Sequence, residues 1–358
     1  MTAGAEFRDY EISKDRIALW PRNKRRGESK LLVATRQRTG SSITDSSFSR
    51  IIEYLTSGDL LIVNTSRVEP CRAYFSHTGS GREVEFFFLA AVGANRWRAY
   101  VRGGGRYTTA DSFSLGPLVA KICGRGESVK EFLVEVSSSE ISDTESKRIT
   151  EILRAHSVMP IPPYIRDGRA VAEDQKYYQT VYAATPGSVA APTAGLHFTD
   201  NLLATLKSRG VEILNIVLHL SAYSMQDLEV ENEANPTATE HYMITEQVWQ
   251  QIQAKKSKQQ RIIAVGTSVT RALESFALLD SATRETSFNR LLKTTLYITP
   301  GFRFQVIDAL LTNFHLPRST HLSLVNAFYG ADRIQQIYTH ALTGDYMFYS
   351  YGDSMLLS

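Results

Sequence analysis

The stretch RIIAVGTSVTRALESFALL (residues 261–279) decides the fold class. Its first apolar residues predict a buried strand, and Gly266 permits a tight turn. The residues from Thr267 onward predict a helix that begins directly after this turn. A strand, a tight turn and a helix in immediate succession are typical of an α/β protein. The apolar run LLIVN (60–64) predicts a second buried strand of the same kind.

A different pattern occupies the chain from about residue 67 to residue 137. Short strand-like runs follow one another there, separated by polar or Gly-rich turns such as HTGSGR and GGGR. The runs are EVEFFFLAAV (83–92), NRWRAYVRG (95–103), FSLGPLVAKICG (113–124) and SVKEFLVEVS (128–137).

The α/β pattern returns after the proline-stiffened connector MPIPPYIRD (159–167). The run DNLLATLKSR (200–209) predicts a helix, and VEILNIVLHL (211–220) predicts a strand. We therefore predict an α/β main domain, formed by residues 1–66 and 157–358. An inserted all-β, barrel-like domain, residues 67–156, interrupts it.

Composition places the chain among soluble globular proteins. Of its 358 residues, 43% are hydrophobic and 22% are charged, which is ordinary. No apolar run approaches the roughly 18 residues of a membrane span, and the N-terminus lacks the apolar core of a signal peptide. We expect a cytoplasmic protein without membrane contact. With only Cys71 and Cys123, and no histidine cluster at metal spacing, neither a disulfide framework nor a metal site is expected.

One basic segment interrupts a nearly balanced charge distribution. The formal net charge is only +3, yet PRNKRRGESK (21–30) holds five Lys or Arg against one Glu. Such a run predicts contact with nucleic-acid phosphates or merely a solvated surface, and this feature alone leaves both open.

Several common catalytic signatures are absent from the sequence. The segment CGRGESV lacks the third glycine of G-x-G-x-x-G, and no G-x-x-x-x-G-K-[ST], G-x-S-x-G or H-E-x-x-H occurs. Dinucleotide enzymes, P-loop ATPases, serine hydrolases and zincins are therefore not expected.

The turn at Gly266 is a candidate anion site. Thr267 and Ser268 offer hydroxyl groups where the new helix leaves backbone N–H groups unpaired, which suits a carboxylate or a phosphate. Ser268 can equally act only as a helix cap. Arg271 and Glu274 share one helix face and can pair with each other.

Three histidines lie close to the ends of predicted elements. His197 follows a run of small residues in AAPTAGLHFTD (190–200), and His315 precedes a proline in TNFHLP. His219 ends an apolar strand, where a hydrogen-bonded core position is the commoner outcome. The aromatic cluster beside Asp353 can pack in the core, hold a cation or stack on a base.

Seven strings, taken together and in this order, resemble the S-adenosylmethionine:tRNA ribosyltransferase-isomerase family. They are spread over most of the chain, so a chance match is hard to credit. The strings are DLLIVNTSRVEP, PPYI, YYQTVYA, GSVAAPTAGLHFT, VGTSVTRALES, TPGFRFQVIDALLTNFHLP and YSYGDSMLL.

The resemblance implies a tRNA-modifying enzyme that consumes S-adenosylmethionine as a ribosyl donor. The ribosyl group passes to the aminomethyl group of 7-aminomethyl-7-deazaguanine (preQ1) at the wobble position of tRNAs with GUN anticodons. It is isomerised there to give epoxyqueuosine, while adenine and methionine leave. The resemblance also implies an α/β domain with an inserted barrel-like domain, and a monomer that needs no metal or other cofactor.

This chemistry needs groups that move protons. A base must remove the proton from the carbon beside the positively charged sulfur, and adenine must be helped to leave. Under the resemblance His197 is the first candidate for proton transfer, followed by Asp353, Asp308 and His315.

The resemblance places the donor between the strings APTAGLHF and VGTSVTR. The backbone at Gly266 and the hydroxyl of Ser268 are expected to hold the methionine carboxylate, assisted by Arg271. The predicted substrate-binding set is completed by Thr193, Gly195, Thr267 and Arg67.

The chain departs from the family pattern near the expected site. SAYSM (221–225) stands where GAGTF is usual, and Ile244 occupies the second histidine position of the usual H-x-M-H-S-E string. A divergent RNA-binding protein of the same fold, with reduced or lost catalysis, is therefore an alternative. A methyltransferase using the same donor is a third possibility, but the usual glycine-rich donor loop is missing.

Overall fold

The computed structural model describes residues 7–37, 41–128, 130–138, 140, 145–222 and 239–358. The chain forms two compact units. The first comprises Met1–Arg67, Pro162–Asp167 and Lys176–Ser358, and the second comprises Val68–Ile161 and Gly168–Gln175. The sequence placed the inserted domain at 67–156, whereas the contacts give the second unit two separate segments.

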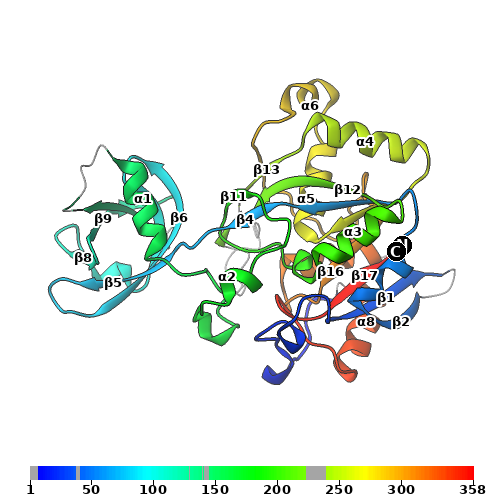
Figure 1. Cartoon of the computed structure of the whole chain (residues 1–358), viewed down its shortest axis with the longest axis horizontal. Coiled ribbons are helices and arrows are strands. Elements are labelled where there is room, and N and C mark those ends of the chain that lie inside the picture. Colours follow the sequence, from blue (N-terminus) through cyan, green and yellow to red (C-terminus); the bar gives the residue numbers. More distant parts are fainter. Residues whose placement is uncertain (1–6, 38–40, 129, 139, 141–144, 223–238) are drawn as a thin grey trace. The chain divides into compact units, whose positions relative to one another are not determined.

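The first unit is built on a nine-stranded mixed sheet (Figure 1). β12, β3, β14 and β16 run parallel, and β17 is antiparallel to β16. The carboxyl ends of the four parallel strands therefore share one edge of the sheet. In spatial order the strands are β15 (Leu292–Thr294), β13 (Glu240–Met243), β12 (Glu212–His219), β3 (Leu60–Asn64), β14 (Ile262–Val265), β16 (Ala309–Asn313), β17 (Ser354–Leu357), β1 (Lys30–Arg36) and β2 (Ser41–Ser47). A separate two-stranded sheet pairs β4 (Ser66–Val68) with β11 (Thr185–Ser188).

Helices cover both faces of the large sheet because its strands are apolar on both sides. In β3, Leu60 and Ile62 belong to one buried cluster, and the alternate residues Leu61 and Val63 belong to another. The first cluster is completed by α4 (Glu246–Ser257), α5 (Thr267–Ala277), α7 (Thr320–Tyr329) and α8 (Ala331–Thr343). The second is completed by the 3₁₀ helix η3 (Phe48–Glu53) and by α3 (Asp200–Ser208). Two further helices, α2 (Asp174–Tyr177) and α6 (Ser281–Ser287), are short.

The second unit is a closed six-stranded antiparallel barrel. In barrel order its strands are β10 (Glu131–Ser138), β7 (Arg96–Val101), β6 (Glu83–Gly93), β5 (Arg72–His77), β8 (Ser112–Leu115) and β9 (Leu118–Arg125). One helix, α1 (Ser146–Ala155), adds Ile149 and Leu153 to the apolar interior. The predicted fold class, an α/β domain with an inserted barrel-like domain, is confirmed.

Candidate functional site

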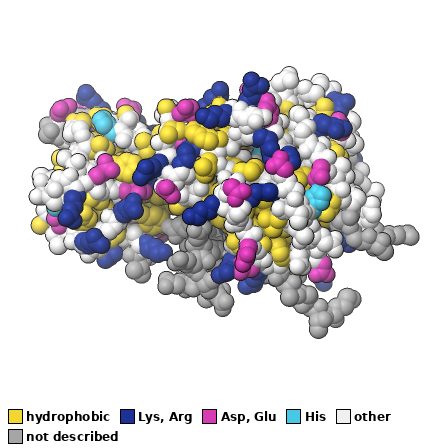
Figure 2. Space-filling model, turned by 90° about the horizontal axis from the view of Figure 1, so that it is seen from below, with side chains coloured by type: hydrophobic (Ala, Val, Ile, Leu, Met, Phe, Trp, Pro, Cys, Tyr) yellow, Lys and Arg dark blue, Asp and Glu magenta, His cyan; other side chains and the backbone are white. Residues whose placement is uncertain are grey.

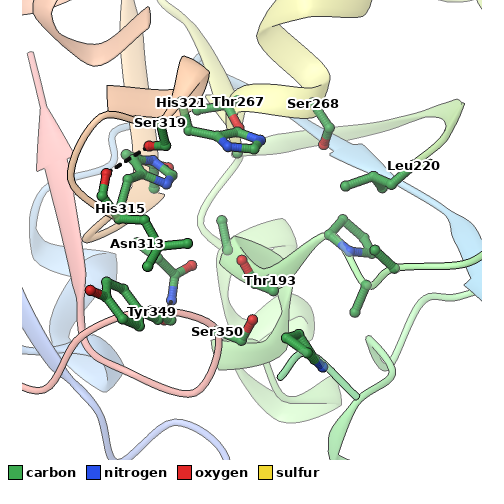
Figure 3. Close-up of a pocket in the computed structure, with 18 of the residues that line it drawn as sticks. Thr193, Leu220, Thr267, Ser268, Asn313, His315, Ser319, His321, Tyr349 and Ser350 are labelled. Atoms are coloured by element: carbon green, nitrogen blue, oxygen red, sulfur yellow. Dashed lines mark hydrogen bonds between the residues drawn. The ribbon is translucent and has the colours of Figure 1, made fainter. Parts of the chain in front are cut away.

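A pocket lies at the carboxyl ends of β14 and β16. Three segments far apart in the sequence meet there: the loop before α3, the start of α5, and the connection from β16 to α7 (Figure 3). In α/β folds, ligands bind at such strand ends. We call this site the strand-end pocket, and its lining residues are Pro162, Tyr164, Tyr178, Ala190, Ala191, Pro192, Thr193, Ala194, Leu220, Gly266, Thr267, Ser268, Thr312, Asn313, Phe314, His315, Leu316, Ser319, His321, Tyr349 and Ser350.

The start of α5 forms one wall of the strand-end pocket. Gly266 is the N-cap residue of α5 and has a φ of 92°, a conformation that other residues rarely adopt. Thr267 and Ser268 are buried and line the pocket. Because the N-cap is a glycine, no side chain caps this helix, so a capping role for Ser268 is wrong. The positive end of the helix dipole and its unpaired N–H groups therefore meet the pocket.

His197 lies behind the pocket wall and is not one of the residues that line it. Its ring is buried against Phe48, with the ring centroids 5.0 Å apart. Nδ1 is 2.8 Å from Ser29 Oγ, and Nε2 is 3.2 Å from Asn313 Nδ2. Since the Asn313 amide can only donate to Nε2, the imidazole is neutral and donates from Nδ1. Burial lowers the pKa of His197 to about 4.

Asn313 connects His197 to the strand-end pocket. Its Nδ2 donates to His197 Nε2 and, at 3.0 Å, to the carbonyl of Tyr349. Its Oδ1 is buried and has no hydrogen-bond partner among the described residues. Buried polar atoms are nearly always paired, so an unpaired acceptor in a pocket wall marks a place for a ligand donor.

Two stacked histidines form another wall of the pocket. The rings of His315 and His321 lie 5.3 Å apart with an interplanar angle of 18°. Nε2 of His315 is 2.8 Å from Thr312 Oγ1, and the described residues offer the His321 ring no hydrogen-bond partner. Burial lowers the pKa of His321 to about 4 and holds the pKa of His315 well below its usual range. Both rings are therefore neutral near pH 7 and can accept a proton.

The two predicted catalytic carboxylates do not lie in the strand-end pocket. Asp353 is buried, binds Arg22 at 2.9 Å, and accepts hydrogen bonds from the backbone N–H groups of Lys30 and Met347. Asp308 is exposed and accepts from the Ile262 backbone N–H at 2.9 Å, which places it at the opposite end of β14. Both carboxylates hold backbone segments in place, and neither enters the site that we propose below.

Arg271 and Glu274, whose spacing allowed them to pair, do not pair with each other. Arg271 instead pairs with the buried carboxylate of Glu240, and its Nε donates to the carbonyl of Leu296 at 3.1 Å. Glu274 accepts three backbone N–H groups, from residues 305–307. Arg271 is not a lining residue of the strand-end pocket. The i,i+3 spacing allowed a local pair, but partners from other elements occupy both groups.

Of the other predicted binding residues, one lines the pocket and two do not. Thr193 lies in the 3₁₀ helix η6 (Thr193–His197) and lines the pocket. Gly195 is a packing residue, because a Cβ there would lie 2.0 Å from the hydroxyl oxygen of Tyr182. Arg67 is exposed on β4 and is not among the residues that line the pocket.

Sequence reasoning missed several residues of the pocket. Asn313, His321 and Ser319 were not singled out, whereas Tyr349 belongs to the aromatic cluster beside Asp353. One available signal was the string HLPRSTH, because it places His321 six residues after His315 across a proline turn. No sequence pattern marks Asn313, since its importance arises from burial and from its contact with His197.

The departures from the family pattern fall partly within the described chain. Ile244 is fully buried in the core that α4 and α5 share, where an apolar side chain is well accommodated. The backbone N–H of Ser221 donates to Glu240 at 3.1 Å, and Ala222 is buried. Residues 223–225 lie outside the described residues.

The basic segment PRNKRRGESK (21–30) and a second one, AKKSKQQR (254–261), are largely engaged within the protein. In the first, Arg22 binds Asp353, and Arg26 donates to the carbonyl of Leu196 at 3.2 Å. In AKKSKQQR (254–261), Lys255 and Arg261 both pair with acidic side chains. On the face drawn in Figure 2, Lys and Arg side chains are interspersed with Asp and Glu. These segments therefore stabilise the fold, and fewer of their charges are available for phosphates than their composition indicates.

Among the described residues, no group of three or more His, Cys, Asp or Glu side chains is placed to hold a metal ion. Every helix of the described chain is too short or too polar to cross a membrane.

Comparisons with known proteins place the chain in a family. The family model described as queuosine biosynthesis protein matches residues 5–357. S-adenosylmethionine:tRNA ribosyltransferase-isomerases from Halothermothrix orenii and Moorella thermoacetica are 39% and 38% identical, and the alignments cover 98% of this chain and 98% of each relative. The crystal structure of the S-adenosylmethionine tRNA ribosyltransferase from Thermotoga maritima matches with a TM-score of 0.53 and 29% identity, over 99% of this chain and 100% of that one. The chain therefore belongs to the S-adenosylmethionine:tRNA ribosyltransferase-isomerase family of queuosine biosynthesis.

Proposed function

We propose that the protein transfers and isomerises the ribosyl group of S-adenosylmethionine onto preQ1 at the wobble position of tRNAs with GUN anticodons. The products are epoxyqueuosine in the tRNA, adenine and methionine. Family membership over nearly the whole chain supports the reaction class. The observation that carries the proposal is the strand-end pocket, which an uncapped helix start and a pair of neutral histidines both line.

In this pocket the start of α5 holds the methionine carboxylate. The unpaired N–H groups after Gly266 and the hydroxyls of Thr267 and Ser268 are suitable donors, and the helix dipole favours negative charge. Thr193 lies across the pocket from this wall (Figure 3). Arg271 acts indirectly, because its pair with Glu240 holds α5 against β13.

The histidine pair supplies proton transfer in the proposed reaction. The carbon beside the sulfonium is acidified by the positive sulfur, and a neutral imidazole can take its proton. His321 is the first candidate for this base because its ring is the less constrained of the two. His315, held by Thr312, is positioned to support it. No lining residue of the pocket as described is Lys, Arg, Asp or Glu, so no charged side chain of the lining forms an ion pair that competes with a cationic donor.

We further propose that the protein acts as a cytoplasmic monomer and needs no metal or cofactor beyond the consumed donor. If so, turnover after dialysis against a chelator equals turnover before it. A loss of activity that added divalent metal restores would contradict this part of the proposal.

Product analysis tests the proposed function. The protein is incubated with a preQ1-containing anticodon stem-loop and S-adenosylmethionine, and the released small molecules are identified. Adenine together with methionine supports the proposal. S-adenosylhomocysteine would indicate a methyltransferase instead, and RNA binding without any donor consumption would indicate a divergent binding protein.

A further inference from the structure

The unpaired carboxamide oxygen of Asn313 is the most constrained polar atom of the strand-end pocket. The side chain is 2% exposed, and its amide orientation is fixed because Nδ2 donates to both His197 Nε2 and the Tyr349 carbonyl. The oxygen therefore cannot exchange places with the nitrogen. Figure 3 shows it on the side of Asn313 that faces Thr193 across the pocket.

Burial alone does not make this oxygen a binding group. Asn326 in α7 is also 2% exposed, donates twice through Nδ2 and leaves its Oδ1 without a partner among the described residues. Asn326, however, does not line the pocket. Asn313 differs because it lines the pocket, so its unpaired acceptor belongs to the pocket wall.

The sheet brings this acceptor beside the start of α5. β14 and β16 are neighbouring parallel strands in which Val265 is level with Leu311, and the Gly266 N–H donates to the Leu311 carbonyl at 2.7 Å. β16 ends at Asn313, and α5 begins at Thr267, directly after the turn at Gly266. The acceptor and the helix start therefore lie at the same ends of two neighbouring strands, and both line the pocket.

Backbone donors and a fixed acceptor in the lining of one pocket match the carboxylate and ammonium of an α-amino acid, which are attached to the same carbon atom. We propose that Asn313 Oδ1 accepts a hydrogen bond from the α-ammonium group of the donor's methionine moiety. His197 is a positioning residue that fixes the Asn313 amide. This inference rests on the proposed function, since it places the methionine end of S-adenosylmethionine at the start of α5.

The inference is tested by comparing the affinities of two ligands for the wild-type protein and for variants. Dissociation constants are measured by calorimetry for S-adenosylmethionine and for an analogue that lacks the α-amino group. The full chain is used together with a stem-loop whose wobble base lacks the aminomethyl group, so that no turnover occurs. The wild-type protein is expected to bind the des-amino analogue roughly 10- to 100-fold more weakly, the usual effect of one hydrogen bond to a charged group.

The Asn313→Ala variant is expected to lose this discrimination and to bind both ligands with affinities within about threefold of each other. Asn326→Ala is the matched control, since it also removes two Nδ2 hydrogen bonds from a buried site but should keep the wild-type ratio. His197→Ala should reduce the ratio, and His197→Gln, whose carbonyl can still accept from Asn313, should restore it.

The result that overturns the inference is an Asn313→Ala protein that keeps the wild-type ratio. A second analogue, S-adenosylmethionine without the amino group of its adenine, gives another contradicting result. If Asn313→Ala changes the relative affinity for this analogue but leaves the ratio for the analogue without the α-amino group unchanged, the inference is overturned as well. A folded wild-type protein that fails to bind S-adenosylmethionine would refute the proposed function itself. Normal turnover with a wild-type ratio in Asn313→Ala would refute only the role of Asn313.

Discussion

Replacing His197 by glutamine tests the structural role of this buried ring through the pH dependence of folding. In the folded protein burial lowers the pKa of His197 to about 4, whereas an unfolded histidine has a pKa of about 6.5. Between these values the unfolded chain binds the proton and the folded chain does not. Acid therefore favours unfolding, and this contribution to stability is lost as the pH falls from about 6.5 toward 4.

The size of the effect follows from the pKa difference. One pKa unit corresponds to about 1.4 kcal/mol, so the full contribution of His197 is on the order of 3 kcal/mol. Between pH 7 and pH 5 the expected share is about 2 kcal/mol. Glutamine cannot titrate, so His197→Gln should lose this share of the pH dependence while keeping a donor and an acceptor at the same place.

Urea unfolding at pH 7 and pH 5 measures the effect. The drop in unfolding free energy between the two pH values should be about 2 kcal/mol smaller for His197→Gln than for the wild type. Ser29→Ala is the control, because it removes the hydrogen bond to Nδ1 but keeps the titrating imidazole. This control should have a lower unfolding free energy at both pH values, but the decrease from pH 7 to pH 5 should be nearly that of the wild type. If the unfolding free energy decreases equally from pH 7 to pH 5 in the wild type and in His197→Gln, the ring is not buried and neutral as described.

Three other substitutions separate catalytic from structural roles. His321→Ala should lower the rate of adenine release by roughly 10²- to 10⁴-fold with little change in melting temperature, and a rate within about threefold of the wild type would exclude it as the base. Asp353→Asn should lower the unfolding free energy by roughly 3 kcal/mol, because it breaks the buried pair with Arg22 and one backbone contact; unchanged stability in urea unfolding would contradict this role. Glu274→Gln should cost about 2 kcal/mol, since an amide cannot accept all three N–H groups that Glu274 binds, and a wild-type unfolding midpoint would argue against these contacts.

Much of the fold could be predicted because its elements are strongly patterned. The segment 261–279 forms β14 and α5, and LLIVN forms β3. The helix predicted for residues 200–209 is α3, capped by the side chain of Thr199. These elements have unbroken apolar periods and clear turn residues, so local signals and tertiary packing agree.

The differences arise where local signals are weak. The barrel includes β5 (Arg72–His77), which was not predicted, and the run 113–124 divides into two strands at Gly116. The apolar residues Phe48, Ile51, Ile52 and Leu55 recur at helical spacing, yet residues 48–53 form the 3₁₀ helix η3 rather than an α-helix. Short strands and 3₁₀ turns depend on neighbours that are distant in sequence.

For the pocket, the sequence motifs predicted which segments meet but not which side chains line it. The resemblance placed the strings around Gly266 and Thr193 at one site, and residues of both strings line the pocket. Which side chains face the pocket could not be inferred, because His197 is turned inward by Ser29 and Asn313. His321 reaches the pocket only because the chain folds back between β16 and α7.

The most direct test of the central claim is a crystal structure of the protein with S-adenosylmethionine and a stem-loop whose wobble base cannot react. We expect the donor in the strand-end pocket, with its methionine carboxylate at Gly266–Ser268 and its sulfonium on the side of His315 and His321. A donor bound at any other place in the chain, with the strand-end pocket empty, would contradict the account.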